Sequence, residues 1–284
     1  MIHKAKILSL IIFSGFAFSL IERPVLDADE INRNDFCPKD NSKYGHTIVL
    51  IDTTEQLNSA KFALMERFVF SKENLMKIAP YDRLSIINLH GREMQASENK
   101  FIFSMCRPRN GSELSNYEID KATFWGTPEA KLKQNWKIFL SYIDQAKDSL
   151  KGPINGSYSQ ILEQIKEVSR LPDFKFDDSY TYRKIIIVSD MVQNSKYLEL
   201  LKTKKMNGKV IEWEKFKKGK NKIWVESIIP RFGKNKPEIE LIYLNSRHDP
   251  RLANGTIDFW KGYLKASGIE DNKFYFEAET SFAP

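Results

Sequence analysis

Short runs of aliphatic residues alternate along the chain with longer stretches in which apolar residues recur every three or four positions. The short runs are typical of strands buried on both faces of a sheet, and they lie at 47–51, 84–90, 184–189 and 239–245. The run at 100–106 follows the second strand after a short polar turn, which indicates a hairpin at the sheet edge. Residues 273–279 alternate like a final edge strand.

The helical spacing predicts four main helices, at about 58–79, 127–152, 157–171 and 253–266. Pro80 ends the first of them, and Thr127 with Pro128 is a typical helix start. Strands that alternate with helices predict an α/β fold, a doubly wound and mostly parallel sheet flanked by helices, with one antiparallel edge strand. We expect one domain at 46–284, without internal repeats.

The N-terminus has the pattern of a targeting segment. Lys4 and Lys6 precede an uncharged, mostly apolar run that ends at Ile21, which falls short of the about 20 apolar residues of a spanning helix. Ala17 and Ser19 form a small-x-small pair at which a signal peptidase could cut. Residues 1–21 are therefore predicted to be a signal peptide or an uncleaved N-terminal anchor, and 22–45 a polar leader. Both alternatives place the domain outside the cytoplasm, periplasmic or secreted, with membrane contact only through an uncleaved anchor.

The chain has two cysteines, Cys37 and Cys106. Both follow the targeting segment, and thiols pair readily in an oxidising compartment. The sequence predicts a Cys37–Cys106 disulfide, with two unpaired buried thiols as the alternative. The C-x-x-C spacing of zinc sites is absent.

The formal charge of +7 comes from one part of the chain. Residues 202–222 contain nine Lys and two Glu, which accounts for the whole excess. This segment lies in a predicted Lys-rich insertion at about 195–238, with Trp213, Phe216 and Trp224. A solvated surface helix whose aromatics pack on the domain is one interpretation. The other is an electrostatic contact with an acidic partner, anionic lipid headgroups or nucleic acid. A uniformly basic nucleic-acid binder is not indicated.

Candidate chemistry lies where two strands end. The first strand runs into Asp52, Thr53 and Thr54, and the strand at 184–189 runs into Asp190. Asp and Thr are common capping and turn residues, so capping is the simpler interpretation. If the strands are central and adjacent, the two carboxylates emerge on one rim of the sheet, where a cation between them would relieve their repulsion.

Hydroxyl groups surround this predicted rim. A third loop, at 155–162, contributes Ser157 and Ser159 before a helix, and each serine could also be its N-cap. Hydroxyl and carboxylate oxygens favour a hard cation, so Mg²⁺ or Mn²⁺ is the expected cofactor.

The Asp-x-Thr-x-Gln sequence after the first strand, the Gly-Ser loop before a mid-chain helix, and Ser-Asp after a later strand resemble the von Willebrand factor A (VWA) family over about residues 45–270. That family's metal-ion-dependent adhesion site uses Asp-x-Ser-x-Ser, a Thr from a second loop and an Asp from a third. The resemblance assigns the corresponding metal positions, with Gln56 replacing the family's second Ser, as follows: Asp52, Thr54, Gln56, Ser157 or preferably Ser159, and Asp190.

The resemblance implies an exported binding or adhesion module, not an enzyme, whose divalent cation captures an acidic group of a protein partner. Two alternatives remain at this stage. One is a metal-dependent hydrolase of phosphate esters, in which the two aspartates hold the metal and the lysines attract the substrate. The other is the same fold with a site that binds no metal.

Overall fold

The computed structural model describes residues 26–27, 29–40, 43–54, 57–89, 101–113, 129–151, 159–171, 182–200, 210–219, 222–244 and 250–278. Its centre is a six-stranded sheet in the order β3-β2-β1-β4-β5-β6. The strands are β1 (Gly45–Asp52), β2 (Arg83–Leu89), β3 (Phe101–Cys106), β4 (Tyr182–Ser189), β5 (Glu238–Tyr243) and β6 (Phe274–Ala278). Only β3 is antiparallel to its neighbour. The predicted α/β fold with a mostly parallel sheet and an antiparallel edge strand is confirmed.

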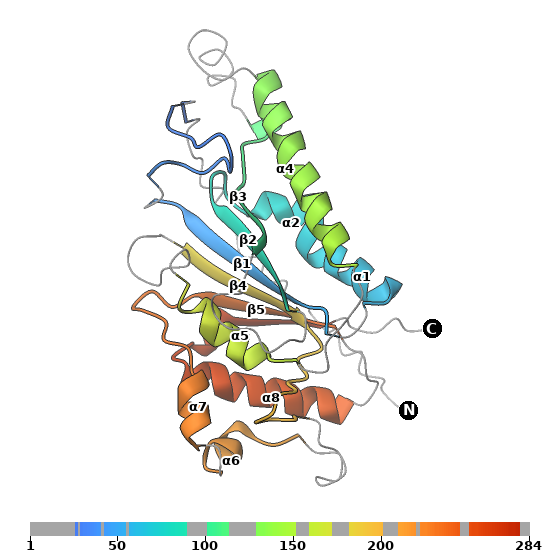
Figure 1. Cartoon of the computed structure of the whole chain (residues 1–284), viewed down its shortest axis with the longest axis vertical. Coiled ribbons are helices and arrows are strands. Elements are labelled where there is room, and N and C mark those ends of the chain that lie inside the picture. The colour runs from blue at the N-terminus through green and yellow to red at the C-terminus, as the bar shows by residue number, and fades with distance from the viewer. Residues whose placement is uncertain are drawn as a thin grey trace, which may run out of the picture.

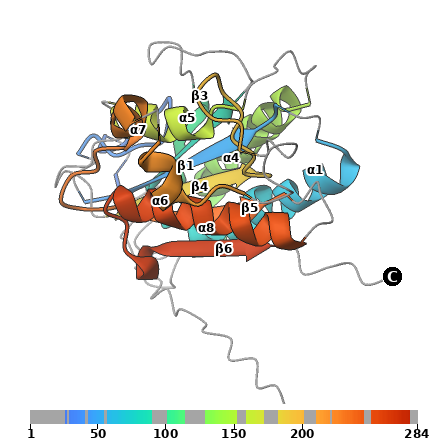
Figure 2. The ribbon, with the colours of Figure 1, turned by 90° about the horizontal axis from the view of Figure 1, so that it is seen from below.

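Helices cover both faces of the sheet (Figures 1 and 2). One face carries α1 (Ser59–Met65), the π-helical turn η1 (Glu66–Phe70), α2 (Lys72–Lys77) and α4 (Glu129–Ser149). The other face carries α5 (Ile161–Val168), α6 (Trp213–Lys217), α7 (Lys222–Ile228) and α8 (Pro250–Ala266). Two 3₁₀ turns complete the described elements, η3 (Gly111–Glu113) and η4 (Asp271–Lys273).

The central strand β1 contributes to a hydrophobic core on each face. Ile48 and Leu50 belong to the core under α5 and α8, and Val49 and Ile51 to the core under α4. All four side chains are fully buried. This two-sided burial explains why the strand sequence is continuously apolar instead of alternating.

The single helix expected at about 58–79 is interrupted, so that prediction was wrong in its extent. Ser71 has extended backbone angles, and its hydroxyl oxygen accepts a hydrogen bond from Asn74 N, so it caps a second helix, α2. The Asn74 side chain donates hydrogen bonds to the carbonyl oxygens of Arg67 and Phe68, which belong to the preceding π-helical turn. These local polar contacts replace the continuous helical hydrogen bonds that the apolar spacing predicts.

The aromatic residues of the Lys-rich insertion pack on the domain, as the simpler interpretation of this segment proposed. Trp213 and Phe216 of α6 are buried, and Trp213 makes edge-on ring contacts with Phe259 and Tyr263 of α8. A Cβ at Gly262 would lie 2.6 Å from Trp213 Cβ, so glycine lets α6 approach α8 closely. Within the Lys-rich insertion, residues 201–209 and 220–221 lie outside the described residues.

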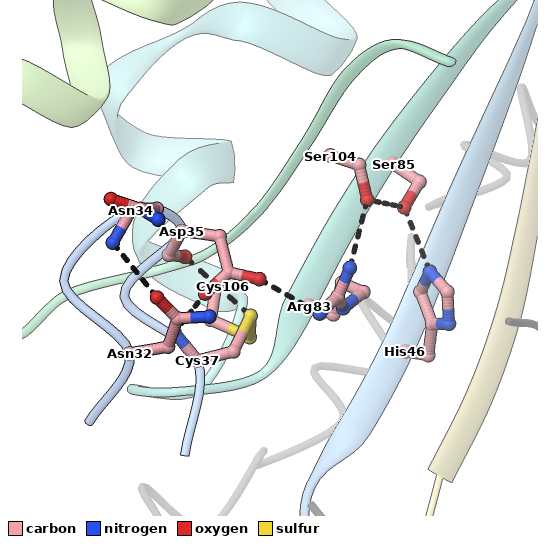
Figure 3. A network of polar contacts seen from close by, with 9 residues as sticks. All are labelled: Asn32, Asn34, Asp35, Cys37, His46, Arg83, Ser85, Ser104 and Cys106. Atoms are coloured by element: carbon pink, nitrogen blue, oxygen red, sulfur yellow. Dashed lines mark hydrogen bonds and ion pairs between the residues drawn. A yellow bond between two sulfur atoms is a disulfide. The ribbon is translucent and has the colours of Figure 1, made fainter. Parts of the chain in front are cut away.

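Part of the predicted leader is fixed to the sheet, as Figure 3 shows. A disulfide joins Cys37 to Cys106 at the end of β3, the pairing that the sequence predicted. The Asp35 carboxylate forms an ion pair with Arg83 at 3.1 Å. The backbone carbonyl oxygen of Asp35 accepts a hydrogen bond from Cys106 N at 2.8 Å. Residues 29–40 are called the disulfide segment below.

A buried polar chain continues from this segment into the sheet. Arg83 Nη1 donates to Ser104 Oγ at 3.2 Å, Ser104 Oγ lies 2.9 Å from Ser85 Oγ, and Ser85 Oγ lies 2.9 Å from His46 Nε2. These contacts join β3, β2 and β1 (Figure 3). Ser85 and His46 are almost fully buried, so each partner satisfies a group that would otherwise lose its hydrogen bonds to water.

None of the helices within the described residues has the length and apolar character that crossing a membrane requires. The predicted targeting segment at 1–21 lies outside that part of the chain.

Candidate functional site

The candidate site lies at the carboxyl ends of β1 and β4. Strands β2 and β3 extend the sheet from one edge of β1. The chain later returns, and β4 pairs with the other edge of β1. The strand order therefore reverses between β1 and β4, which is where doubly wound sheets bind their ligands. The two strands are central and adjacent, which is the condition on which the expected shared rim depended.

Asp52, the last residue of β1, accepts four hydrogen bonds. Its Oδ1 receives the backbone N–H of Thr54 at 3.0 Å and the Thr54 hydroxyl at 2.6 Å. Its Oδ2 receives the hydroxyl groups of Ser159 at 2.9 Å and Ser189 at 2.8 Å. The Asp52 side chain is 6% exposed, so these bonds replace most of its contact with water.

Ser189 was not among the site residues predicted from the sequence. The register between β1 and β4 explains why it lies beside Asp52. Ile51 pairs with Val188, so the next residues on the two strands, Asp52 and Ser189, are the direct neighbours. Asp190 lies one position further along, and its Oδ1 accepts a hydrogen bond from Val192 N at 2.9 Å. The group directly across from Asp52 is therefore a hydroxyl, and the expectation that the two carboxylates emerge side by side stays a prediction. Knowledge of the register would have identified Ser189.

Ser159 reaches the site from the loop before α5. Its backbone forms a two-way bridge with Asn194, with both N–O distances 2.8 Å, so the loop after β4 holds it in place. The bridge also explains why α5 begins at Ile161 instead of near 157 as expected. The preference for Ser159 agrees with its contact with Asp52, whereas Ser157 and Gln56 lie outside the described residues.

Gln193 fastens the loop after β4 to α5. It is fully buried, its Oε1 accepts a hydrogen bond from Leu162 N at 2.9 Å, and its Nε2 donates to Glu163 Oε2 at 2.8 Å. These contacts give Gln193 a structural role in the loop. The loop that carries Asn194 is thereby held against the helix that follows Ser159.

Met191, directly after Asp190, has a left-handed backbone with φ of 57°. Such a conformation is costly for a residue with a side chain. It is held by Met191 N donating to Ser189 Oγ at 2.8 Å and by Trp260 Nε1 donating to Met191 O at 2.9 Å. This tight turn fixes the direction in which the chain leaves β4 beside Asp190.

Burial raises the pKa of the Glu163 carboxyl group. Hydrogen bonds from its own backbone N–H, from Gln193 and from Ser195, and the charge of Lys166, act in the opposite direction but are outweighed. The folded protein therefore binds this proton more tightly than the unfolded chain does. As the pH rises through the folded-state pKa, Glu163 ionises in a poorly hydrated place, and the folded state loses stability relative to the unfolded chain.

Replacing Glu163 by glutamine is therefore expected to raise the thermal midpoint at pH 8 and to have little effect at pH 4. The variant carries no charge at either pH, while the wild type carries its buried charge only at the higher pH. Thermal unfolding of both proteins across this range measures the difference. Glu167→Gln is the control, because Glu167 on the same helix is ion-paired with Lys166 and Arg170. A gain that is equal at both pH values would contradict the prediction.

The donor set at the site suits a small hard cation. When the hydroxyl groups of Thr54, Ser159 and Ser189 donate their protons to Asp52, oxygen lone pairs remain available on each of them. Thr54 and Asp190 are half-buried, so a ligand can reach this rim from solvent. Within the described residues there is no group of three or more His, Cys, Asp or Glu side chains placed to hold a metal. Thr54 and the two serines are not among those residue types.

Comparison with models of known protein families finds no match to this chain, and comparison with curated proteins finds none either.

Proposed function

We propose that the domain is an exported, VWA-like binding module that holds Mg²⁺ or Mn²⁺ at the rim beside Asp52 and captures an acidic group of a protein partner. The observation that supports this most directly is the convergence of hydroxyl groups from three separate segments on one buried carboxylate. The three segments are the turn after β1, the loop before α5 and the end of β4. The strand order, which reverses between β1 and β4, brings two of these segments to neighbouring strand ends.

In this proposal, Thr54 and Ser159 contribute neutral hydroxyl oxygens to the cation, and Asp52 and Asp190 contribute negative charge. Because the direct ligands would be mostly neutral hydroxyl groups, an anionic oxygen from outside the domain would complete the coordination shell of the cation. Asp52 orients the hydroxyl groups of Thr54, Ser159 and Ser189, and so it has a structural task as well as an electrostatic one. No covalent chemistry is involved.

Addition of millimolar Mg²⁺ or Mn²⁺ after EDTA treatment is expected to raise the thermal midpoint. A ligand that binds only the folded state at 100 times its dissociation constant adds about 2.7 kcal/mol, which corresponds to several degrees. Thr54→Val should remove most of this rise, because valine keeps the shape of threonine without its hydroxyl group. Thermal unfolding with and without metal measures it.

Thr53→Val is the matched control for the metal experiment. Thr53 is the neighbouring residue, but its hydroxyl donates to Asn88 Oδ1 at 2.6 Å and not to Asp52. Its replacement should leave the metal-dependent rise intact. The absence of any rise in wild type, or an equal loss in both variants, would contradict a cation site at Thr54.

Binding of the acidic group needs a separate measurement once the cation is established. We suggest an array of peptides containing Glu or Asp, each paired with its Gln or Asn counterpart, probed in Mg²⁺ and again in EDTA. The proposal requires binding that depends on both the carboxylate and the metal. Metal binding without such a preference would leave the cation site in place but refute this choice of ligand.

A further inference from the structure

The outward face of α4 has a pattern that fits a second copy of itself. The side chains Leu132, Trp136, Phe139, Ile143 and Ala146 are buried against the sheet. The opposite side is exposed to solvent among the described residues, and α4 lies at the periphery of the molecule in Figure 1. Ile138 and Tyr142, two of the four exposed large hydrophobic residues of the described chain, lie here at 37% and 45% exposure.

A row without charge runs along this face. Its members are spaced by four, three and four residues, which is the spacing of the contact row of a helix that packs along a second helix. They are Gln134, Ile138, Ser141 and Gln145. Uncharged side chains in such a row, with the small Ser141 near its middle, allow two helices to pack without repulsion between like charges.

Beside this row lies a row of charged residues that is self-complementary. The N-terminal half of α4 carries Lys133 and Lys137, and the C-terminal half carries Asp144 and Asp148. The spacing places all four on one side of the helix. When two copies of α4 lie antiparallel, Lys137 of each faces Asp144 of the other, and Lys133 faces Asp148.

The ion pairs that these residues make within the chain are exposed to solvent. Lys133 is paired with Glu129, and the two side chains are 56% and 45% exposed. Lys137 makes no ion pair among the described residues, although it is exposed. Asp144 contacts Lys147 of the same helix and Asp148 contacts Lys151 just after it, but the two aspartate side chains are 67% and 72% exposed. Exposed ion pairs of this kind contribute little to the stability of the fold. Replacing them with ion pairs to another chain therefore costs little free energy.

From these observations we propose that the protein forms a symmetric homodimer in which α4 packs antiparallel on α4 of the second copy. The two-fold axis passes close to Ser141, where the uncharged row of one copy crosses that of the other. A two-fold axis requires a surface that is complementary to itself, and the reversed charge row meets that requirement. Because the row has one large apolar residue, Ile138, the dimer should form at micromolar or higher concentration.

Charge reversal tests the antiparallel arrangement directly. We expect Lys137→Glu alone and Asp144→Lys alone each to weaken dimerisation of the full chain about tenfold or more, because each change creates two like-charge contacts per dimer. The double variant should restore the wild-type dissociation constant to within a few-fold. Sedimentation velocity over a concentration series measures this constant, with the thermal midpoint confirming that each variant is folded.

A cross-linking experiment places the axis independently. The two cysteines of the chain are joined to each other, so a cysteine introduced at position 141 is the sole free thiol. Oxidised Ser141→Cys should form a covalent dimer. Ser149→Cys on the same face should not, because at 1.5 Å per residue the two copies of position 149 lie about 25 Å apart.

Three results would overturn the proposal. They are a wild-type chain that stays monomeric at all concentrations, a double variant as weak as the single ones, or equal cross-linking at positions 141 and 149.

Discussion

Asp52→Ala is expected to lower the free energy of unfolding by about 3 kcal/mol even without metal. The change removes the acceptor for four hydrogen bonds, and it leaves the buried hydroxyl groups of Ser159 and Ser189 without their partner. Hydrogen bonds to charged groups contribute about 1.5–3 kcal/mol each and do not add fully. Denaturant unfolding in EDTA measures the loss.

Asp52→Asn and Asp190→Asn sharpen this experiment. The amide at position 52 keeps one oxygen acceptor, so its loss should be smaller than that of alanine. At position 190 the amide oxygen can still accept from Val192 N, so a change below about 1 kcal/mol is expected. If repulsion between the two carboxylates dominated this rim, Asp52→Ala would stabilise the protein, and such a result would refute the hydrogen-bonded arrangement as the main source of stability.

The second large effect concerns the disulfide segment. Replacing both Cys37 and Cys106 by serine is expected to lower the free energy of unfolding by about 4 kcal/mol, because the bridge closes a loop with a sequence separation of 69. The unfolded chain gains this conformational freedom when the bridge is absent. Denaturant unfolding of the double variant, and of wild type with a reductant, should give the same loss.

Arg83→Met is the comparison for the bridge. The change removes the ion pair between Arg83 and Asp35, whose side chains are 23% and 25% exposed, respectively. It also removes the hydrogen bond from Arg83 to Ser104. We expect a loss of about 1 kcal/mol, well below that of the cysteine variant. Similar losses from the two changes would mean that the polar contacts, and not the covalent bridge, fix the segment.

The strands were predictable because their signal is local. A run such as residues 48–51 is apolar at every position, which few structures other than a buried strand explain. The break at Ser71 was not predictable from spacing, since Phe62, Met65, Phe68 and Val69 keep a helical period from α1 into the π-helical turn. At this point the hydrogen bonds of the Ser71 hydroxyl and the Asn74 amide determine the backbone conformation. They end the helix although the apolar spacing predicts that it continues.

The site was predictable in part for the same reason. Asp52, Thr54 and Ser159 are polar residues next to apolar runs, and the structure brings these three together. Ser189 was read as the end of its strand, because its role depends on which residue faces it across β1 and β4. Register is a property of two distant segments, and no local pattern encodes it.

The position of β1 also bears on how the chain reaches its fold. One neighbour, β2, follows soon after in the sequence, but the other, β4, comes only after β3, α4 and α5. Pairing of such distant segments is slow, because the loop between them must close before the contacts form. During that time the edge of β1 that β4 will cover is open to strands of other chains. Early folding intermediates are therefore most exposed to wrong pairing along the strand that ends in Asp52.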